Sequence, residues 1–208
     1  MKKVITTIVF LLSASVFLSA QSKYENGMQK AFGLWKAGKT NKAIAMFERI
    51  GQAEKDNWVP LYHAANALIS ASFQTKDLNT KNNMLEKAKT IIADAHKRSE
   101  KNAELLTLEG LLYTAYLATD PATYGMTLPA KIQKLHGQAI SIDPDNPRAL
   151  LNKIEYEMGA ARFFGKDLSP FCEKIKTVIP KFEKDTPSTP FAPSHGLERA
   201  QQIANSCQ

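Results

Sequence analysis

The chain has 208 residues, of which 44% are hydrophobic and 23% are charged, a balance typical of globular proteins rather than of disordered or fibrous ones. Its formal net charge is +7 at neutral pH, but the lysines are spread along the whole chain instead of gathering with aromatic residues in one segment. Nucleic-acid-binding proteins concentrate basic residues on one face, so we expect no nucleic-acid partner. A solvated basic surface is the main interpretation, and weak attraction to acidic envelope polymers is the alternative.

Residues 1–20 have the features of a secretory signal peptide. Two lysines precede an apolar run, residues 4–18, that is too short to span a bilayer, and Ala20 is the small residue that signal peptidase requires. An uncleaved anchor is the alternative, because Leu18 is larger than the cleavage site prefers. No cysteine directly follows the run, so lipidation is not expected. The sequence predicts an exported protein, periplasmic or secreted, whose single domain covers residues 21–208 and has no stable membrane insertion after signal cleavage.

Apolar residues recur at spacings of three and four along almost the whole mature chain, as in amphipathic helices. No alternating strand pattern or hairpin dipeptide is present in the sequence. In chain order, helices are expected over residues 24–37, from the cap Thr40, after the cap Asn57, after the polar stretch 74–79, after Asn102, over 130–142, after Asn146, over 171–183 with Pro180 bending or ending it, and from Ser194. A loop over residues 119–129 and an extended linker over residues 187–193 interrupt them. The predicted fold class is all-α.

One short segment, Asp143-Pro144-Asp145-Asn146-Pro147, separates two apolar helical runs. The residue before a proline avoids the helical conformation, so the first helix is expected to end at Asp143. Asn146 can cap the second helix while Pro147 occupies its first turn, where a missing N–H costs little. We expect a hinge that turns the chain so that one helix pair stacks on the next.

The helix pairs share landmarks that suggest internal repeats. Small residues stand where the first helix of a pair approaches the second, and further small or apolar residues follow in the second helix. The residues that carry this pattern are Ala31, Ala65 and Gly110 in the first helices, Ala43, Phe47, Ala88, Ile92, Ala95 and Ala139 in the second helices, and the terminating Pro144. On these residues the chain resembles the tetratricopeptide repeat (TPR) family, including exported TPR-like proteins of Bacteroidetes-type bacteria.

This resemblance implies a particular architecture. It predicts TPR-like stacked helical hairpins, an α–α superhelix, with repeats at about residues 24–57, 58–101, 102–146 and 147–186. A C-terminal capping helix would cover residues 194–206.

The resemblance also implies a binding groove, because one helix of each pair lines the concave surface that such stacks use for binding. The groove positions are then Met28, Phe32, Trp35, Tyr62, His63, Asn66, Thr107 and Leu111. A stripe of Met and aromatic residues suits an apolar peptide or a partner helix; the alternative is a plain core between repeats. Met28 and Phe32 stand where the carboxylate clamp of some family members has a basic residue and an Asn, so we do not expect that activity.

No catalytic motif is present in the sequence. The four histidines are far apart, so no metal site or cofactor is expected. Glu155 and Glu157, on either side of Tyr156, are two residues apart and do not share a helix face. The sequence therefore predicts a non-enzymatic binding or scaffold protein with a protein or peptide partner in the cell envelope. The alternative is a ligand-binding or hydrolytic domain with a pocket under the inserted loops, near Tyr124 and Arg162.

Cys172 and Cys207 are the two cysteines of the chain. Cysteines of exported proteins usually pair, and closing a loop of about 35 residues stabilises a fold by roughly 4 kcal/mol in the chain-entropy model. We expect this disulfide; two separate thiols are the alternative.

An unusual segment, Phe163-Phe164-Gly165, ends the helix that Asn146 caps. We expect both aromatic residues to anchor this helix end against the C-terminal helices, with Gly165 as the C-cap. A recognition loop is the alternative.

Overall fold

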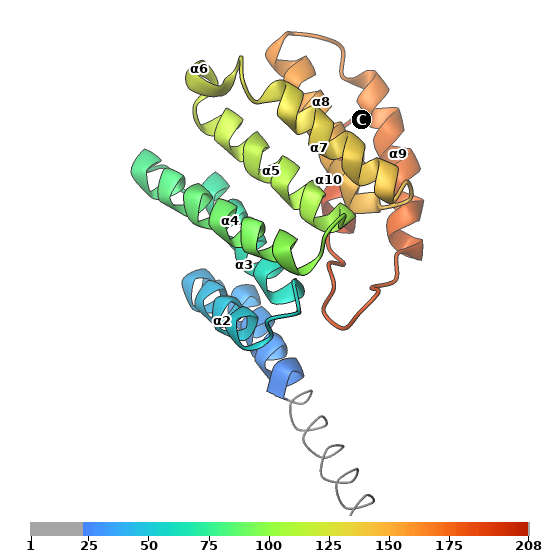
Figure 1. Ribbon diagram of the computed structural model, residues 1–208. Helices are drawn as coiled ribbons and strands as arrows, with labels where there is room; N and C mark the ends of the chain where they lie inside the picture. Colours follow the sequence, from blue (N-terminus) through green and yellow to red (C-terminus); the bar gives the residue numbers. More distant parts are fainter. Residues whose placement is uncertain (1–22, 208) are drawn as a thin grey trace, which may run out of the picture.

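The helices of the protein form antiparallel pairs that stack side by side, as the computed structural model of residues 23–207 shows (Figure 1). The predicted signal peptide lies outside these described residues. Within them there are helices and no strands. The helices are residues 23–36, α2 (Thr40–Ala53), α3 (Val59–Gln74), α4 (Leu78–Arg98), α5 (Ala103–Thr119), α6 (Pro121–Tyr124), α7 (Pro129–Ile142), α8 (Pro147–Phe163), α9 (Ser169–Lys184) and α10 (Leu197–Ser206). The predicted fold class, all-α with TPR-like stacked hairpins and a C-terminal capping helix, is confirmed.

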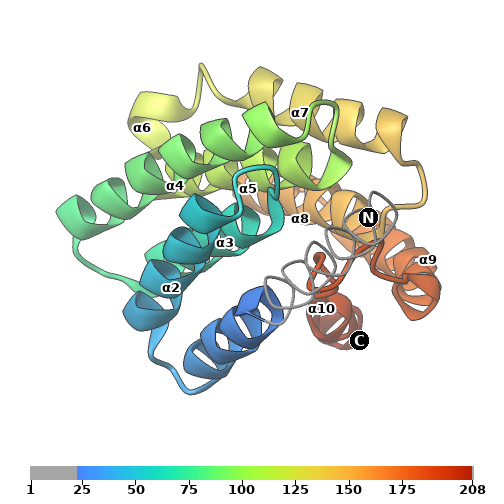
Figure 2. The same ribbon diagram turned by 60° about the horizontal axis from the view of Figure 1, so that its bottom comes forward.

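Four helix pairs make up the stack. The first helix, residues 23–36, pairs with α2 through Phe32 and Phe47, whose ring centroids are 5.2 Å apart. The other pairs are α3 with α4, α5 with α7, and α8 with α9, and α10 packs on α9. Neighbouring pairs contact each other through α2 and α3, α4 and α5, and α7 and α8. Figure 2 shows α2, α4 and α7 on the outer side and α10 facing the first helix across the inner side.

Most of the predicted helix starts are present. The Asn102 side chain accepts from the backbone N–H groups of Glu104 and Leu105, and Asn146 accepts from Ala149 at 2.9 Å. Both satisfy donors that a helix start otherwise leaves unpaired. The hinge before Pro147 is therefore present, and the chain turns there from α7 into α8.

Three predicted helix starts are wrong. Trp58 rather than Asn57 occupies the cap position of α3, although the Asn57 side chain accepts from the Val59 backbone N–H at 3.0 Å. Thr40 is the first helical residue rather than a cap, since Lys39 occupies the cap position without a side-chain hydrogen bond. The last helix starts at Leu197 rather than at Ser194, because Gly196 before it has a left-handed φ of 119°. A Cβ at Gly196 would come within 2.7 Å of Phe182 Cζ, so this turn requires glycine.

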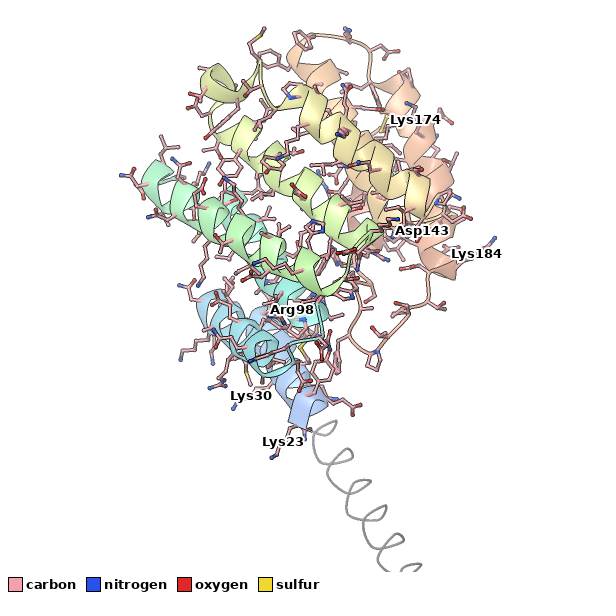
Figure 3. The ribbon with its side chains drawn as sticks, in the orientation of Figure 1. Lys23, Lys30, Arg98, Asp143, Lys174 and Lys184 are labelled. Carbon is pink, nitrogen blue, oxygen red and sulfur yellow. A yellow bond between two sulfur atoms is a disulfide. The ribbon has the colours of Figure 1, made fainter. Side chains whose placement is uncertain are left out.

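The small residues of the repeat pattern lie at helix crossings. Ala31 and Ala65 are fully buried, and a Cβ at Gly110 would lie 2.8 Å from Cε1 of His136 on α7. A further tie comes from Arg98 at the end of α4 (Figure 3), which donates to the carbonyl of Gly51 at 2.6 Å and so holds the end of α2. The close approach of the helices at these residues fixes how the helix pairs lie against one another.

The apolar core has two main parts. The larger one runs from the first helix to α5, and the smaller one joins α8, α9 and α10. Cys172 and Cys207 form a disulfide with Sγ atoms 2.05 Å apart, which fastens α10 to α9. Lys23, Lys30, Lys174 and Lys184 lie on the outside at different ends of the stack (Figure 3). None of the helices among residues 23–207 is both long and apolar enough to cross a bilayer.

Candidate binding groove

A cavity of about 1420 Å³, which we call the groove, lies on the inner side of the stack. Its walls come from the first helix of each pair and from the segment after α9. The lining side chains that matter most for its chemistry are Phe32, Trp35, Lys36, His63, Asn66, Phe73, Leu111, Arg148, Tyr156, Phe191, His195 and Arg199. Aromatic and aliphatic side chains thus surround a few polar groups, as in many ligand sites.

The structure divides the predicted groove residues into two sets. Five of them line the groove: Phe32, Trp35, His63, Asn66 and Leu111. The other three, Met28, Tyr62 and Thr107, are buried and do not line it, so their predicted groove position is wrong. Met28 and Tyr62 belong to the larger core, and the Thr107 hydroxyl donates to the Ala103 carbonyl one turn earlier.

The segment between α9 and α10, residues 186–196, closes part of the groove, and we call it the strap. Phe191 in its middle stacks on Phe32, with ring centroids 6.1 Å apart, and meets Tyr24 edge-on at 5.8 Å. The backbone φ of Phe191 is +65°, a left-handed conformation that residues other than glycine rarely adopt. The sequence predicts only an extended linker here. The one sequence feature that could have indicated a packed segment is Phe191, an aromatic residue within a proline-rich linker.

The strap also forms a wall between two cavities. Arg148, Pro187 and Ala192 line the groove and also a smaller, more polar cavity of about 410 Å³ on the other side. Arg148 on α8 holds the start of the strap, because its guanidinium donates to Glu104 at 2.8 Å and to Asp185 at 3.3 Å. The strap therefore contributes to the walls of both cavities.

Two histidines contribute to the groove wall. His63 lies 2.7 Å from the Phe191 carbonyl through Nε2; since a carbonyl only accepts, Nε2 carries the proton and the buried Nδ1 has no hydrogen-bond partner. Burial lowers the pKa of His63 to about 4. The His195 side chain is exposed, and the nearby charge of Arg148 lowers the pKa of its imidazole. Both imidazoles are therefore neutral near pH 7, but the unprotonated Nδ1 of His63 is buried, so the exposed His195 is the one of the two that can bind a metal centre.

Charged groups lie around the groove. Arg199 on α10 donates to Glu155 on α8 at 2.7 Å, whereas Lys36 forms no ion pair with any described residue. Glu157 forms an ion pair with Lys174, so the two neighbouring carboxylates, Glu155 and Glu157, have different basic partners. Among residues 23–207, no three His, Cys, Asp or Glu side chains are grouped so that they could hold a metal ion.

The inserted loop over residues 119–129 does not contribute to the groove. It contains α6, and Tyr124 packs on Tyr116 with ring centroids 5.6 Å apart. Arg162 is exposed. No residue of the loop lines either cavity described above, so the ligand-binding alternative now concerns the groove rather than a pocket under this loop.

The prediction that two aromatic residues anchor the end of α8 is wrong. The side chains of Phe163 and Phe164 are 76% and 70% exposed. Gly165 does end the helix in a left-handed conformation, with a φ of +64°, as a C-cap requires.

Comparisons with known proteins place the fold. No family model matches the chain, and no curated protein matches it. Among solved structures, the HusA haemophore from Porphyromonas gingivalis is similar, with a TM-score of 0.73 and 23% sequence identity over 88% of this chain and 92% of that one. A thermophilic TPR protein of Thermus thermophilus is also found, with a TM-score of 0.41 and 16% identity over 88% of this chain and 98% of that one. The first similarity shows a shared fold.

Proposed function

We propose that the chain is a non-enzymatic, exported binding protein of the cell envelope, and that the groove holds a compact, largely apolar ligand. One observation carries this proposal: the inner side of the stack holds a partly open cavity of about 1420 Å³, and residues of the strap form part of its wall. A walled cavity encloses a compact ligand better than an extended chain. Its aromatic lining supplies the contact area such a ligand needs.

The candidate ligand is a tetrapyrrole such as haem. Its flat apolar faces suit a site between Trp35, Leu111 and Tyr156, and its iron would accept a neutral imidazole such as that of His195. Lys36, which lacks an ion pair among the described residues, can attract the carboxylates of the ligand. HusA, a haemophore, has a similar fold, and this supports the same ligand class for the groove.

Haem titration tests this proposal. We expect a saturable shift of the haem absorbance and quenching of Trp35 fluorescence, measured in a Trp58→Phe background because the chain has two tryptophans. His63→Ala and His195→Ala should be compared with His96→Ala, which alters a histidine on α4 that bonds Glu109 outside the groove. At least one groove variant is expected to lose the absorbance shift while His96→Ala keeps it. Absence of saturable binding, or equal losses in all three variants, would overturn the haem proposal.

A peptide or partner helix is the second candidate, and the strap itself favours it. Phe191 enters the groove from an extended segment and stacks on Phe32, as the anchor residue of a bound peptide does. A photoreactive amino acid at position 36 is expected to crosslink one envelope protein of the native host, while the same group at position 97, on α4, does not. Phe32→Ala should abolish the crosslink. A crosslink that survives Phe32→Ala would argue against a peptide site in the groove.

A further inference from the structure

The exposed apolar side chains of the protein gather at one edge of the stack. Among the described residues, six large hydrophobic residues are exposed. Five of them, Phe73, Leu78, Met126, Phe163 and Phe164, lie at the turns that join the two helices of a pair. The sixth, Ile142, lies at the end of α7, at the opposite edge. We call the first edge the tip edge.

The topology brings these turns together. Helices α3, α5 and α8 run toward the tip edge and their partners run away from it, and α5 packs against both α3 and α8. In Figure 1 the edge passes from the start of α4, through α6, to the turn between α8 and α9. The most protruding side chains are Met126, which is 95% exposed, and the adjacent rings of Phe163 and Phe164.

The charges at these turns are not balanced. The carboxylates of Asp77, Asp120 and Asp167 each accept from a backbone N–H at the start of the following helix, where the helix dipole compensates them. Five cations lie in or beside the turns within the helix pairs, against these three carboxylates, and no described residue forms an ion pair with them: Lys36, Lys39, Lys76, Arg162 and Lys166. The tip edge therefore presents separate apolar side chains together with uncompensated cations.

We propose that the tip edge docks on an anionic lipid bilayer. Protein partners require contiguous, well-packed surfaces, whereas these side chains stand apart on polar turns. A bilayer interface accepts each side chain separately, and its phosphates attract lysine and arginine. Phe73 also lines the groove, so docking through this edge brings one end of the groove to the membrane.

Vesicle co-sedimentation of residues 21–208 tests the proposal. Binding to vesicles of phosphatidylcholine with about 30% phosphatidylglycerol should exceed binding to phosphatidylcholine alone and weaken at high salt. The double variant Phe163→Ser/Phe164→Ser should bind at least about tenfold more weakly, since two large apolar side chains no longer insert. The matched control Ile142→Ser removes an exposed apolar residue at the opposite edge and should bind like the wild type.

Three results would overturn the proposal. The first is an absence of binding to the anionic vesicles, and the second is an equal loss in Ile142→Ser and the double variant. The third is a wild-type dimer in sedimentation velocity that the double variant abolishes, because a second copy of the chain would then cover the tip edge. Vesicle binding does not depend on haem, so this test and the haem titration can fail independently.

Discussion

At the crossing of α5 and α7, Gly110 leaves no space for a side chain, because a Cβ there would lie 2.8 Å from His136 Cε1. Gly110→Ala forces the buried ring aside, and overpacking of this kind typically costs about 1–3 kcal/mol. The gain in helix propensity offsets up to about 1 kcal/mol. We expect a net loss of about 1 kcal/mol or more in the free energy of unfolding, measured by urea denaturation.

The matched control lies on α7, the other helix of this crossing. Gly137 on α7 is exposed, and a Cβ there meets no atom within 4 Å. Gly137→Ala should therefore stabilise the protein by about 0.5–1 kcal/mol through helix propensity alone. Equal effects of the two substitutions would show that the crossing is not the cause.

His136 itself should make stability depend on pH. Burial, and then the charge of Lys153, lower its pKa to about 4 in the folded protein, against about 6.5 in an unfolded chain. Between these values the unfolded state binds a proton that the folded state does not, so stability is complete above about pH 6.5 and falls as the pH drops toward about 4. The full shift corresponds to about 3 kcal/mol for one histidine. His63 and His195 act in the same direction.

Replacement of His136 separates its contribution to the pH dependence of stability from that of the other histidines. Neither ring nitrogen of His136 has a hydrogen-bond partner, so His136→Leu should be nearly neutral at about pH 7.5. At about pH 4.5 the variant should be more stable than the wild type by about 2 kcal/mol in urea denaturation. Gly137→Ala, which removes no titratable group, should shift stability equally at both pH values. An unchanged pH slope in His136→Leu would contradict the assignment.

The sequence predicts the helix crossings better than it predicts the groove. Ala31 and Gly110 at the crossings were identifiable because close helix approach requires a small residue at a repeating position. Met28 and Phe32 lie one turn apart on the same stripe, and periodicity alone does not tell which faces the core. Phe191 decides this, because the strap covers Phe32 from a position about 160 residues further along the chain. Contacts of that sequence separation leave no local pattern.

Among the elements, α5, α8 and the start of the strap are joined by one buried arginine. Arg148 is 6% exposed in its side chain and pairs with Glu104 and Asp185. Arg148→Met leaves two largely buried carboxylates without their cation, a change that costs about 3–5 kcal/mol. We expect this loss in thermal or urea unfolding, together with faster proteolysis of the strap.

A double-mutant cycle tests whether the pairing is responsible. Glu104→Gln combined with Arg148→Met removes one unpaired charge, so the double variant should lose less stability than the two single variants together. Purely additive losses would mean that Arg148 stabilises by packing alone.

Helix boundaries were predictable where a side chain caps the helix. Asn102 and Asn146 have capping oxygens within reach of the next backbone N–H groups, and their hydrogen bonds are present. Pro180 was expected to bend or end its helix, and it does not end it, since α9 continues to Lys184. Apolar side chains on both sides, including Val178 and Phe182, hold the helix to the smaller core. Tertiary packing therefore keeps α9 helical beyond Pro180, and the local helix propensity of the sequence does not reveal this.

At the scale of the whole molecule, the two main apolar cores are joined by a small cluster of Ala103, Ala139 and Ala149 on α5, α7 and α8, and by the strap. The larger core spans the first helix to α5, and the smaller one spans α8 to α10. Phe191 on the strap packs against the larger core, so the strap returns the C-terminal part of the chain to the first helix pair. The disulfide fixes the far end of α10 to α9. Together these ties keep α10 in the groove wall.

Loss of the disulfide should therefore loosen one part of the molecule selectively. The α10 helix has 10 residues, too few to be stable alone in water, so Cys172→Ser/Cys207→Ser should release it more often from α9. Hydrogen exchange should accelerate in α10 and the strap while α3 and α4, in the larger core, keep their protection. The overall loss is bounded by the chain-entropy value of about 4 kcal/mol, and the wild type treated with a reducing agent should match the variant. Since Arg199 and His195 lie in the released region, groove affinity should fall as well. Uniform acceleration across α3, α4 and α10 would instead mean that the stack unfolds as one unit, and the groove wall could then not open without the rest of the protein.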